Sequence, residues 1–269
     1  MSVALVLAGG QSRRMGTDKL SLHLTKDASC VESNPVAQSS VVTILEHVSA
    51  VCKTIADEVW LLTSPDTERV VSKLAKNGQA VSHIVRKQGH TSPVTQQDLA
   101  HAAQQDLAHV TQQHAGRVRV VADDEFYAGP LRALAHAWSL LREQSATSEA
   151  MLTQADSYVF IVAGDLPGLT SEVLIACKSK LDQGTDDVDA VLVTRDGMLQ
   201  PLLGCYRLRA GRVFVNALDE GEKRILPALR ELCVETVSPE DCHWPEWWTR
   251  PVHTPGDYED WLMARGSAK

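Results

Sequence analysis

The sequence predicts an α/β fold built on a mostly parallel, doubly wound sheet. Short apolar segments rich in β-branched residues alternate with longer segments in which apolar residues recur at helical spacing. The resulting order, strand-helix-strand-helix-strand, is typical of such a sheet. The 269 residues are 44% hydrophobic, which provides an ample core for one large domain. We therefore interpret residues 1–269 as a single domain.

The elements follow from apolar periodicity, taken in chain order. The expected strands cover residues 3–8, 20–24, 58–63, 81–85, 117–122, 158–163, 188–194 and 201–207. The expected helices cover residues 35–53, 66–76, 130–142, 171–181, 212–218, 225–232 and 256–265. Because the strand at 158–163 is the most apolar, we expect it near the centre of the sheet. Gly129 and Pro130 stand where a helix begins.

Two segments depart from this alternation. A low-complexity insert at about 88–116 contains a tandem repeat of eight residues, TQQDLAHA followed by AQQDLAHV. The alternatives are one amphipathic helix or a partly disordered insert, and the apolar stripe of Leu99, Leu107 and Val110 favours the helix. A Trp-rich tail at about 239–269 is expected to be anchored to the domain by its rings.

Composition excludes several classes of function. The formal net charge of −8 disfavours a nucleic-acid or anionic-membrane partner. No window approaches the ~20 apolar residues of a membrane span, and no basic flank indicates a signal peptide. The six cysteines show no C-x-x-C pairing, which is typical of buried thiols in a reducing compartment. We therefore expect a cytoplasmic protein without a nucleic-acid or membrane partner.

The first expected strand runs directly into a glycine-rich, basic loop. Gly9 and Gly10 let backbone N–H groups turn inward around a phosphate. Arg13, Arg14 and Lys19 then supply mobile positive charge for a polyphosphate. The loop lacks the Gly-Lys-Ser/Thr of a Walker motif and the third glycine of a dinucleotide fingerprint. It therefore predicts a nucleotide site of another kind.

A carboxylate closes the most apolar strand, in the sequence Gly164-Asp165-Leu166-Pro167. Ligands of open α/β sheets gather at the carboxyl ends of strands, where a carboxylate can hold Mg²⁺ against phosphates. The alternative interpretation of Asp165 is a turn residue or a helix N-cap. The phosphate loop at the same edge of the sheet favours the metal role.

Five sequence blocks occur in the order LAGGQSRRMGTDK, VVADDEFYAGPL, VFIVAGDLP, QPLLGCY and LDEGEKR, between residue 3 and about residue 232. In this order they resemble the molybdenum cofactor guanylyltransferases, the MobA family of GT-A-like nucleotidyltransferases. The resemblance implies a Rossmann-like three-layer fold with a mostly parallel central sheet. It implies Mg²⁺-dependent transfer of GMP from GTP to the molybdopterin phosphate, with release of pyrophosphate. It further implies GTP and molybdopterin as ligands, other molybdenum-cofactor enzymes as partners, and a monomer or weak homo-oligomer.

The resemblance also implies roles for individual residues. The expected catalytic residues are Lys19 and Arg13, which would offset phosphate charge, and Asp165, which would hold the metal. The expected nucleotide-binding residues are Leu7, Ala8, Gly9, Gly10, Lys19, Asp123 and Asp165. The expected substrate-binding residues are Gly129, Pro130, Leu131, Gln200, Pro201, Lys223 and Arg224.

Two departures from the family pattern fall on these blocks and on the tail. Arg132 stands where the family has a small residue, and His253 stands where it has asparagine. Mg²⁺ prefers oxygen to imidazole nitrogen, so His253 puts that part of the site in question. The alternatives are a cytidylyltransferase, another nucleotidyltransferase with a different phosphate acceptor, or a non-catalytic nucleotide-binding homologue. Gly9, which cytidylyl relatives replace by alanine, favours guanine, while Lys19 with Asp165 favours an active enzyme.

Overall fold

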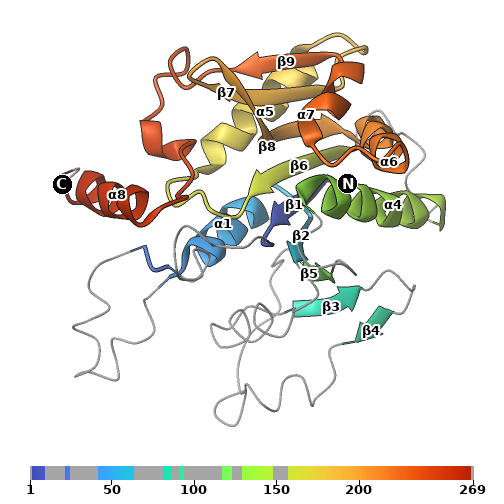
Figure 1. Ribbon diagram of the computed structural model, residues 1–269, viewed down its shortest axis with the longest axis horizontal. Coiled ribbons are helices and arrows are strands. Elements are labelled where there is room, and N and C mark those ends of the chain that lie inside the picture. Colours follow the sequence, from blue (N-terminus) through green and yellow to red (C-terminus); the bar gives the residue numbers. More distant parts are fainter. Residues whose placement is uncertain are drawn as a thin grey trace.

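The computed structural model describes residues 2–9, 22–24, 42–63, 81–85, 91–93, 117–122, 129–147 and 157–267. These residues form one nine-stranded sheet with helices packed on both of its faces (Figure 1). The predicted α/β fold, with three layers and a mostly parallel central sheet, is confirmed.

The sheet is assembled from both halves of the chain. Its strands are β1 (Ser2–Leu7), β2 (Glu58–Thr63), β3 (Val81–Val85), β4 (Thr91–Pro93), β5 (Arg117–Ala122), β6 (Tyr158–Ala163), β7 (Ala190–Arg195), β8 (Met198–Arg207) and β9 (Val234–Val237). Their order across the sheet is β4-β3-β5-β2-β1-β6-β8-β7-β9. Strands β3, β5, β2, β1 and β6 are mutually parallel, whereas β4 and β8 run antiparallel to their neighbours. The apolar strand β6 lies inside the sheet, between β1 and β8.

Helices cover both faces of the sheet. They are α1 (Ile44–Lys53), α4 (Pro130–Thr147), α5 (Ser171–Gln183), α6 (Arg212–Asp219), α7 (Ile225–Ala228) and α8 (Pro255–Ser267). Short 3₁₀ turns are η6 (Leu208–Gly211), η7 (Leu229–Glu231) and η8 (Glu246–Trp248). Successive side chains of a strand point to opposite faces. Accordingly Ala4 and Val6 of β1 pack in the core under α1 and α5, whereas Val3 and Leu5 pack under α4 and α6 (Figure 1).

The helix predicted over 35–53 begins later than its apolar spacing indicates. Thr43 is extended and caps α1: its hydroxyl accepts from the Glu46 N–H at 3.3 Å, and Glu46 accepts from the Thr43 N–H at 2.7 Å. This reciprocal capping box fixes the start at Ile44. The strand predicted over 20–24 is, in its described part, a single bridge between His23 and Thr43.

Other boundaries also differ from prediction. Helix α4 continues to Thr147, into a segment predicted as a polar connection, and the helix predicted over 225–232 is divided into α7 and η7. The strands β4 and β9 were not predicted, because three or four residues are too few to establish a period. The helix predicted over 66–76 and the repeat at 95–114 lie outside the described residues.

The Trp-rich tail packs onto the domain. The Trp247 and Trp261 ring centroids are 5.6 Å apart. Trp244 and Trp248 pack against the core that lies between the sheet and the helices α1 and α5. A Cβ added to Gly168 would lie 2.3 Å from the Trp247 carbonyl oxygen, so only glycine permits this approach. The tail therefore presses against the loop that follows β6.

Among the five described cysteines, all free thiols, Cys52, Cys177 and Cys205 are buried as expected, but Cys242 is half-buried and Cys233 is exposed beside the edge strand β9. Within the described ranges, none of the helices has the length and apolar character needed to cross a bilayer.

Candidate active site

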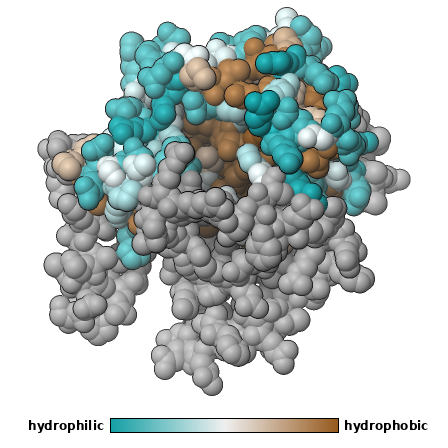
Figure 2. All heavy atoms as spheres, viewed as in Figure 1, coloured by the Kyte–Doolittle hydropathy of each residue, from teal (hydrophilic) through white to brown (hydrophobic). Residues whose placement is uncertain are grey.

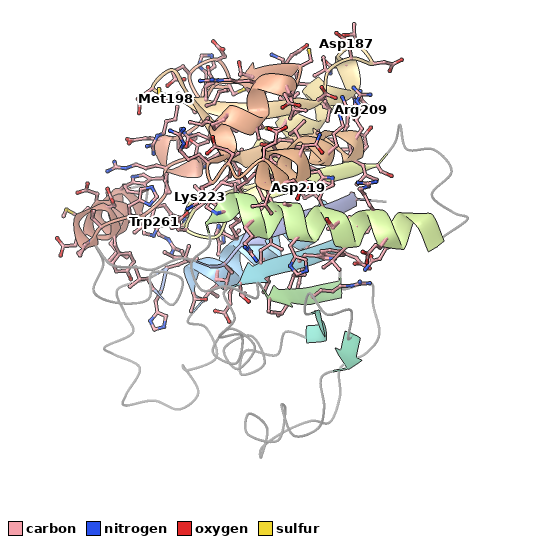
Figure 3. The ribbon with its side chains drawn as sticks, turned by 45° about the vertical axis from the view of Figure 1, so that its right-hand side comes forward. Asp187, Met198, Arg209, Asp219, Lys223 and Trp261 are labelled. Carbon is pink, nitrogen blue, oxygen red and sulfur yellow. The ribbon has the colours of Figure 1, made fainter. Side chains whose placement is uncertain are left out.

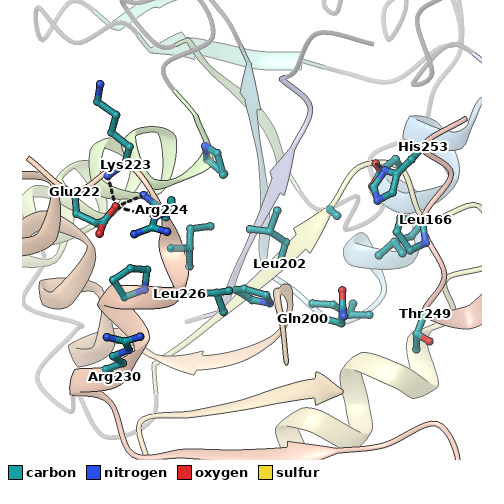
Figure 4. A pocket seen from close by; sticks show the side chains of 18 residues that line it. Leu166, Gln200, Leu202, Glu222, Lys223, Arg224, Leu226, Arg230, Thr249 and His253 are labelled. Atoms are coloured by element: carbon teal, nitrogen blue, oxygen red, sulfur yellow. Dashed lines mark hydrogen bonds and ion pairs between the residues drawn. The ribbon is translucent and has the colours of Figure 1, made fainter. Parts of the chain in front are cut away.

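A cavity of about 800 Å³ lies beyond the carboxyl end of β6, alongside β8. Its size falls in the ~300–1,000 Å³ range of small-molecule sites. Figure 2 shows an apolar hollow with a hydrophilic rim. Six of the residues expected to form the site line this one cavity: Pro130, Asp165, Gln200, Pro201, Lys223 and Arg224. They come from the start of α4, the loop after β6, strand β8 and the loop before α7 (Figure 4).

Asp165 is held between the sheet and the tail. Its side chain is 7% exposed, and its backbone carbonyl accepts from the Val252 N–H at 2.9 Å. The preceding Gly164 donates its N–H to the Leu7 carbonyl at 3.1 Å. Because β6 and β1 are parallel neighbours, the loops that follow them open at the same edge of the sheet.

The loop after β1 begins at this edge. The Leu7 carbonyl accepts a hydrogen bond from the Gly164 N–H, and the Ala8 N–H donates to the Leu62 carbonyl at 2.9 Å. Both groups are therefore hydrogen-bonded to the neighbouring strands or to the loop after β6. Gly9, the next residue, is exposed. Leu7 and Ala8, two of the residues expected to bind the nucleotide, are thus tied to the sheet where the loop begins. The remaining expected residues of this part of the site, Gly10, Arg13, Lys19 and Asp123, lie outside the described residues.

The turn that opens α4 approaches the cavity from another side. Gly129 has a φ of +92°, in the region that favours glycine, and a Cβ added there would lie 3.7 Å from the Lys223 carbonyl oxygen. Figure 3 shows Lys223 at this end of α4. Leu131 is fully buried in the core, so its side chain supports α4 instead of lining the cavity. Arg132 is half-buried on α4 and is not among the lining residues.

A cationic rim, formed by Lys223, Arg224 and Arg230, borders the cavity near α7 (Figure 4). Glu222 shapes its loop: one carboxylate oxygen accepts the N–H groups of Lys223 at 2.8 Å and Arg224 at 2.9 Å. These two backbone hydrogen bonds lower the pKa of Glu222. Arg230 was not predicted, because it belongs to no motif and reaches the cavity only through the packing of α7 and η7.

His253 extends the site from the tail. Its Nδ1 lies 3.4 Å from Asp165 Oδ2, and its side chain is 55% exposed (Figure 4). Asp257 fixes the backbone here, accepting the N–H of His253 at 3.1 Å and the N–H and hydroxyl of Thr254, both at 2.8 Å. The pattern Thr254-x-x-Asp257, an acidic residue three positions after a threonine, marks the start of α8 in the sequence.

The ionisation of Asp257 makes the free energy of unfolding depend on pH. Burial alone would raise the pKa of Asp257, but hydrogen bonds from the Thr254 hydroxyl and from the His253 and Thr254 N–H groups lower it to about 2. A lowered pKa contributes stability that is present above the unfolded value, ~3.9, and is lost as the pH falls toward 2. Asp257→Asn should therefore reduce the free energy of unfolding at pH 7 by about 1 kcal/mol, as loss of a helix cap does.

Denaturant unfolding at pH 7, 4 and 3 checks this expectation. The difference between the wild type and Asp257→Asn should shrink as the pH falls. Asp260→Asn, on the same helix, provides the matched control, because its carboxylate is 57% exposed and contacts Arg250 at 3.4 Å. If the free energies of unfolding of the wild type and Asp257→Asn differed by the same amount at every pH, the lowered pKa of Asp257 would be contradicted.

Comparison with known proteins identifies the family. The family model described as "MobA-like NTP transferase domain" matches residues 4–232. The chain belongs to this family. The match includes most of β1, Asp165 and the cationic rim, whereas His253 and α8 lie beyond it. The predicted resemblance is thereby confirmed, and the chain is a member of a nucleotidyltransferase family.

One sequence relative and two solved structures resemble the chain over most of its length. A protein named as a probable molybdenum cofactor guanylyltransferase, from Synechococcus elongatus, is 26% identical over 242 residues, 90% of each chain. Molybdopterin-guanine dinucleotide biosynthesis protein A from Archaeoglobus fulgidus has a TM-score of 0.59 at 18% identity, with 99% of this chain and 100% of that chain covered. The 4-diphosphocytidyl-2C-methyl-D-erythritol synthase from Anaerococcus prevotii has a TM-score of 0.52 at 12% identity, covering 99% and 96%. The two solved structures share the fold.

Proposed function

We propose that this MobA-like protein transfers GMP from GTP to the phosphate of molybdopterin and releases pyrophosphate. The observation that carries the proposal is one cavity that is lined both by the buried carboxylate of Asp165 and by the cationic rim. In Figure 4 the rim lies on the side opposite His253, whose Nδ1 is 3.4 Å from Asp165 Oδ2. This arrangement suits a reaction between two phosphate-bearing substrates. The curated relative from Synechococcus elongatus supports the choice of nucleotide and acceptor.

In this reaction the protein positions the two substrates and neutralises phosphate charge. A phosphomonoester oxygen of the acceptor attacks the α-phosphorus of GTP in line, and the bond from the α-phosphorus to the bridging oxygen breaks as pyrophosphate leaves. The nucleophile belongs to the substrate, so no side chain needs to become covalently attached. The cationic rim would hold the acceptor phosphate in place, and Lys19 with Arg13 would offset charge on the departing pyrophosphate.

Asp165 fits the role of magnesium ligand. Its carboxylate lines the cavity, is 7% exposed, and stands at the sheet edge where the loop after β1 also opens. Bound there, Mg²⁺ would supply positive charge to the α- and β-phosphate oxygens. The backbone bonds from Val252 and to β1 hold Asp165 in register with that loop.

The walls of the cavity suit the rest of the acceptor. Pro201, Leu202 and Leu226 line the cavity and offer an apolar surface to a planar ring system. Leu226 is 49% exposed, so part of its side chain is accessible to a ligand in the cavity. The Gln200 amide supplies polar groups at the same wall.

Nucleotide choice is tested by thermal unfolding. GTP with Mg²⁺ should raise the melting temperature more than ATP, CTP or UTP does. At a hundred times its dissociation constant a ligand adds about 2.7 kcal/mol to the free energy of unfolding, which gives a readily measured shift. Equal or greater stabilisation by CTP would assign the chain to cytidylyl transfer, and binding of GTP without turnover would assign it to non-catalytic nucleotide binding.

The acceptor side is tested at Arg230. Arg230→Ala should raise the KM for the acceptor about tenfold or more, because a charge-assisted hydrogen bond to phosphate is worth ~1.5–3 kcal/mol. The KM for GTP should stay within about twofold, since the rim lies across the cavity from His253, the neighbour of Asp165 (Figure 4).

The matched control for Arg230 is Arg212→Ala. Arg212 is an exposed arginine at the start of α6 that does not line the cavity. Both variants are compared in initial-rate assays with each substrate varied in turn. A rise in the KM for GTP alone would place Arg230 with the nucleotide and contradict the proposal.

A further inference from the structure

We infer that Tyr258 and Arg265 of α8 are positioning residues for the nucleotide: they fix the chain that leaves the glycine-rich, basic loop after β1, and through it they orient Lys19 toward the triphosphate. The inference rests on the proposed function, which places a nucleoside triphosphate at that loop. It goes further by giving the C-terminal helix, which lies beyond the residues that the family model matches, a part in substrate binding.

The segment that follows the loop, residues 22–24, is attached to the chain just before α1. An antiparallel bridge joins His23 to Thr43, and the Ile44 N–H donates to the Leu22 carbonyl at 2.9 Å. These are backbone contacts, so they fix the path of the segment whatever its side chains are.

Helix α8 supplies two further hydrogen bonds to the same segment. The Tyr258 hydroxyl donates to the His23 carbonyl at 2.6 Å, and Arg265 Nη1 donates to the Leu24 carbonyl. Burial raises the pKa of Tyr258, so the phenol is protonated at neutral pH and able to donate. Their spacing, i and i+7, places both side chains on one face of α8.

An anchor on this segment is also an anchor for Lys19. Lys19 comes three positions before Leu22, and three residues of chain span at most ~11 Å, so a fixed Leu22 limits where Lys19 can lie. The start of the loop is fixed as well, by the hydrogen bonds of Leu7 and Ala8 to their neighbours. Fixing both ends of a loop reduces the conformational entropy that a ligand must remove to position the side chains between them.

The same C-terminal segment holds the opposite part of the nucleotide site. The Val252 N–H donates to the Asp165 carbonyl at 2.9 Å, and the Trp247 backbone lies against Gly168 in the loop after β6. The contact between the Trp247 and Trp261 rings joins this part of the tail to α8. The tail therefore contacts both the segment after the basic loop and the loop that carries Asp165.

The competing explanation is that the Tyr258 and Arg265 bonds only attach the tail to the domain. Simple attachment contributes to the free energy of unfolding but leaves the affinity of the folded protein for each ligand unchanged. Positioning acts on the triphosphate and spares the acceptor, and its effect requires Lys19. These differences decide the measurements.

The experiment uses the full chain and Tyr258→Phe, which keeps the ring and removes the hydroxyl that donates to His23. The dissociation constant for GTP with Mg²⁺, measured by titration calorimetry, should rise about fivefold, as loss of one hydrogen bond allows. The KM for the acceptor should stay within about twofold. In a double-mutant cycle, adding Tyr258→Phe to Lys19→Gln should raise the dissociation constant by less than about twofold further.

Tyr158→Phe is the matched control. Its hydroxyl also donates to a side chain, that of Asp182, but at the beginning of β6, whereas the cavity lies beyond the other end of that strand. This variant should keep the wild-type affinity for GTP. Arg265→Ala, which removes the neighbouring bond, should weaken GTP in the same direction as Tyr258→Phe.

Three results would overturn the inference: unchanged affinity for GTP in Tyr258→Phe, an equal rise in the KM for the acceptor, or full additivity with Lys19→Gln. Failure of the guanylyl assignment looks different. If CTP binds in place of GTP and shows the same changes in Tyr258→Phe and in the cycle, the choice of nucleotide is wrong while the positioning role stands.

Discussion

Asp165→Asn should reduce GMP transfer by two or more orders of magnitude, which corresponds to about 3 kcal/mol of lost transition-state stabilisation. Asparagine keeps the size of a side chain that is only 7% exposed, and the backbone bond from Val252 is unaffected. The substitution therefore removes an anionic oxygen from the cavity and changes little else. The measurement is pyrophosphate release from GTP in the presence of molybdopterin and Mg²⁺.

Two companion variants define what this result means. Asp219→Asn makes the same substitution at an exposed position at the end of α6 (Figure 3) and should keep wild-type activity. His253→Asn restores the family's oxygen donor and should leave Mg²⁺-dependent activity unchanged or higher. Full activity in Asp165→Asn, or its abolition in His253→Asn, would mean that the metal lies elsewhere in the cavity.

The predictability of the fold varied with the strength of the local signal. Strands β2, β3, β5 and β6 have the predicted bounds. In β2 and β6 the signal is a short apolar run, and in β3 and β5 it is a short segment rich in β-branched residues. The start of α1 was not predicted, because the apolar spacing continues the helical pattern upstream of Thr43. The capping box formed by Thr43 and Glu46 would have marked it. The edge strand β9 is four residues long and only partly buried, so neither length nor apolarity revealed it.

The site was predictable where residues belong to motifs. Asp165, Gln200 and Lys223 were expected from the family resemblance, and they line the same cavity. The family pattern placed His253 at this part of the site, but its contact with Asp165 could not be derived from spacing, because it depends on how the tail folds back over the loop after β6. Arg230 was missed altogether, because it belongs to no motif. Tertiary packing, not local pattern, brings these two side chains to the cavity.

Replacement of Trp138 should give the largest loss in the free energy of unfolding among the variants considered. The ring is fully buried, with Tyr206 and Phe214 centroids at 6.2 and 5.3 Å, and its Nε1 donates to the Leu208 carbonyl at 2.8 Å. A Cβ added to Gly211 would lie 1.7 Å from this ring, so η6 and α6 are fitted directly against it. Trp138→Ala should lower the free energy of unfolding by about 3–5 kcal/mol, because it leaves a cavity and an unpaired carbonyl.

Two variants on α4 separate the causes of that loss. Trp138→Phe keeps an aromatic ring but removes the hydrogen bond to Leu208, so its effect should fall between the wild type and Trp138→Ala. Arg142→Ala, at an exposed position of the same helix, should change stability by no more than about 0.5 kcal/mol. Urea unfolding measures all three. Equal losses in Trp138→Ala and Arg142→Ala would mean that the α4–α6 contact contributes little, whereas the buried ring and its fitted glycine require a large difference.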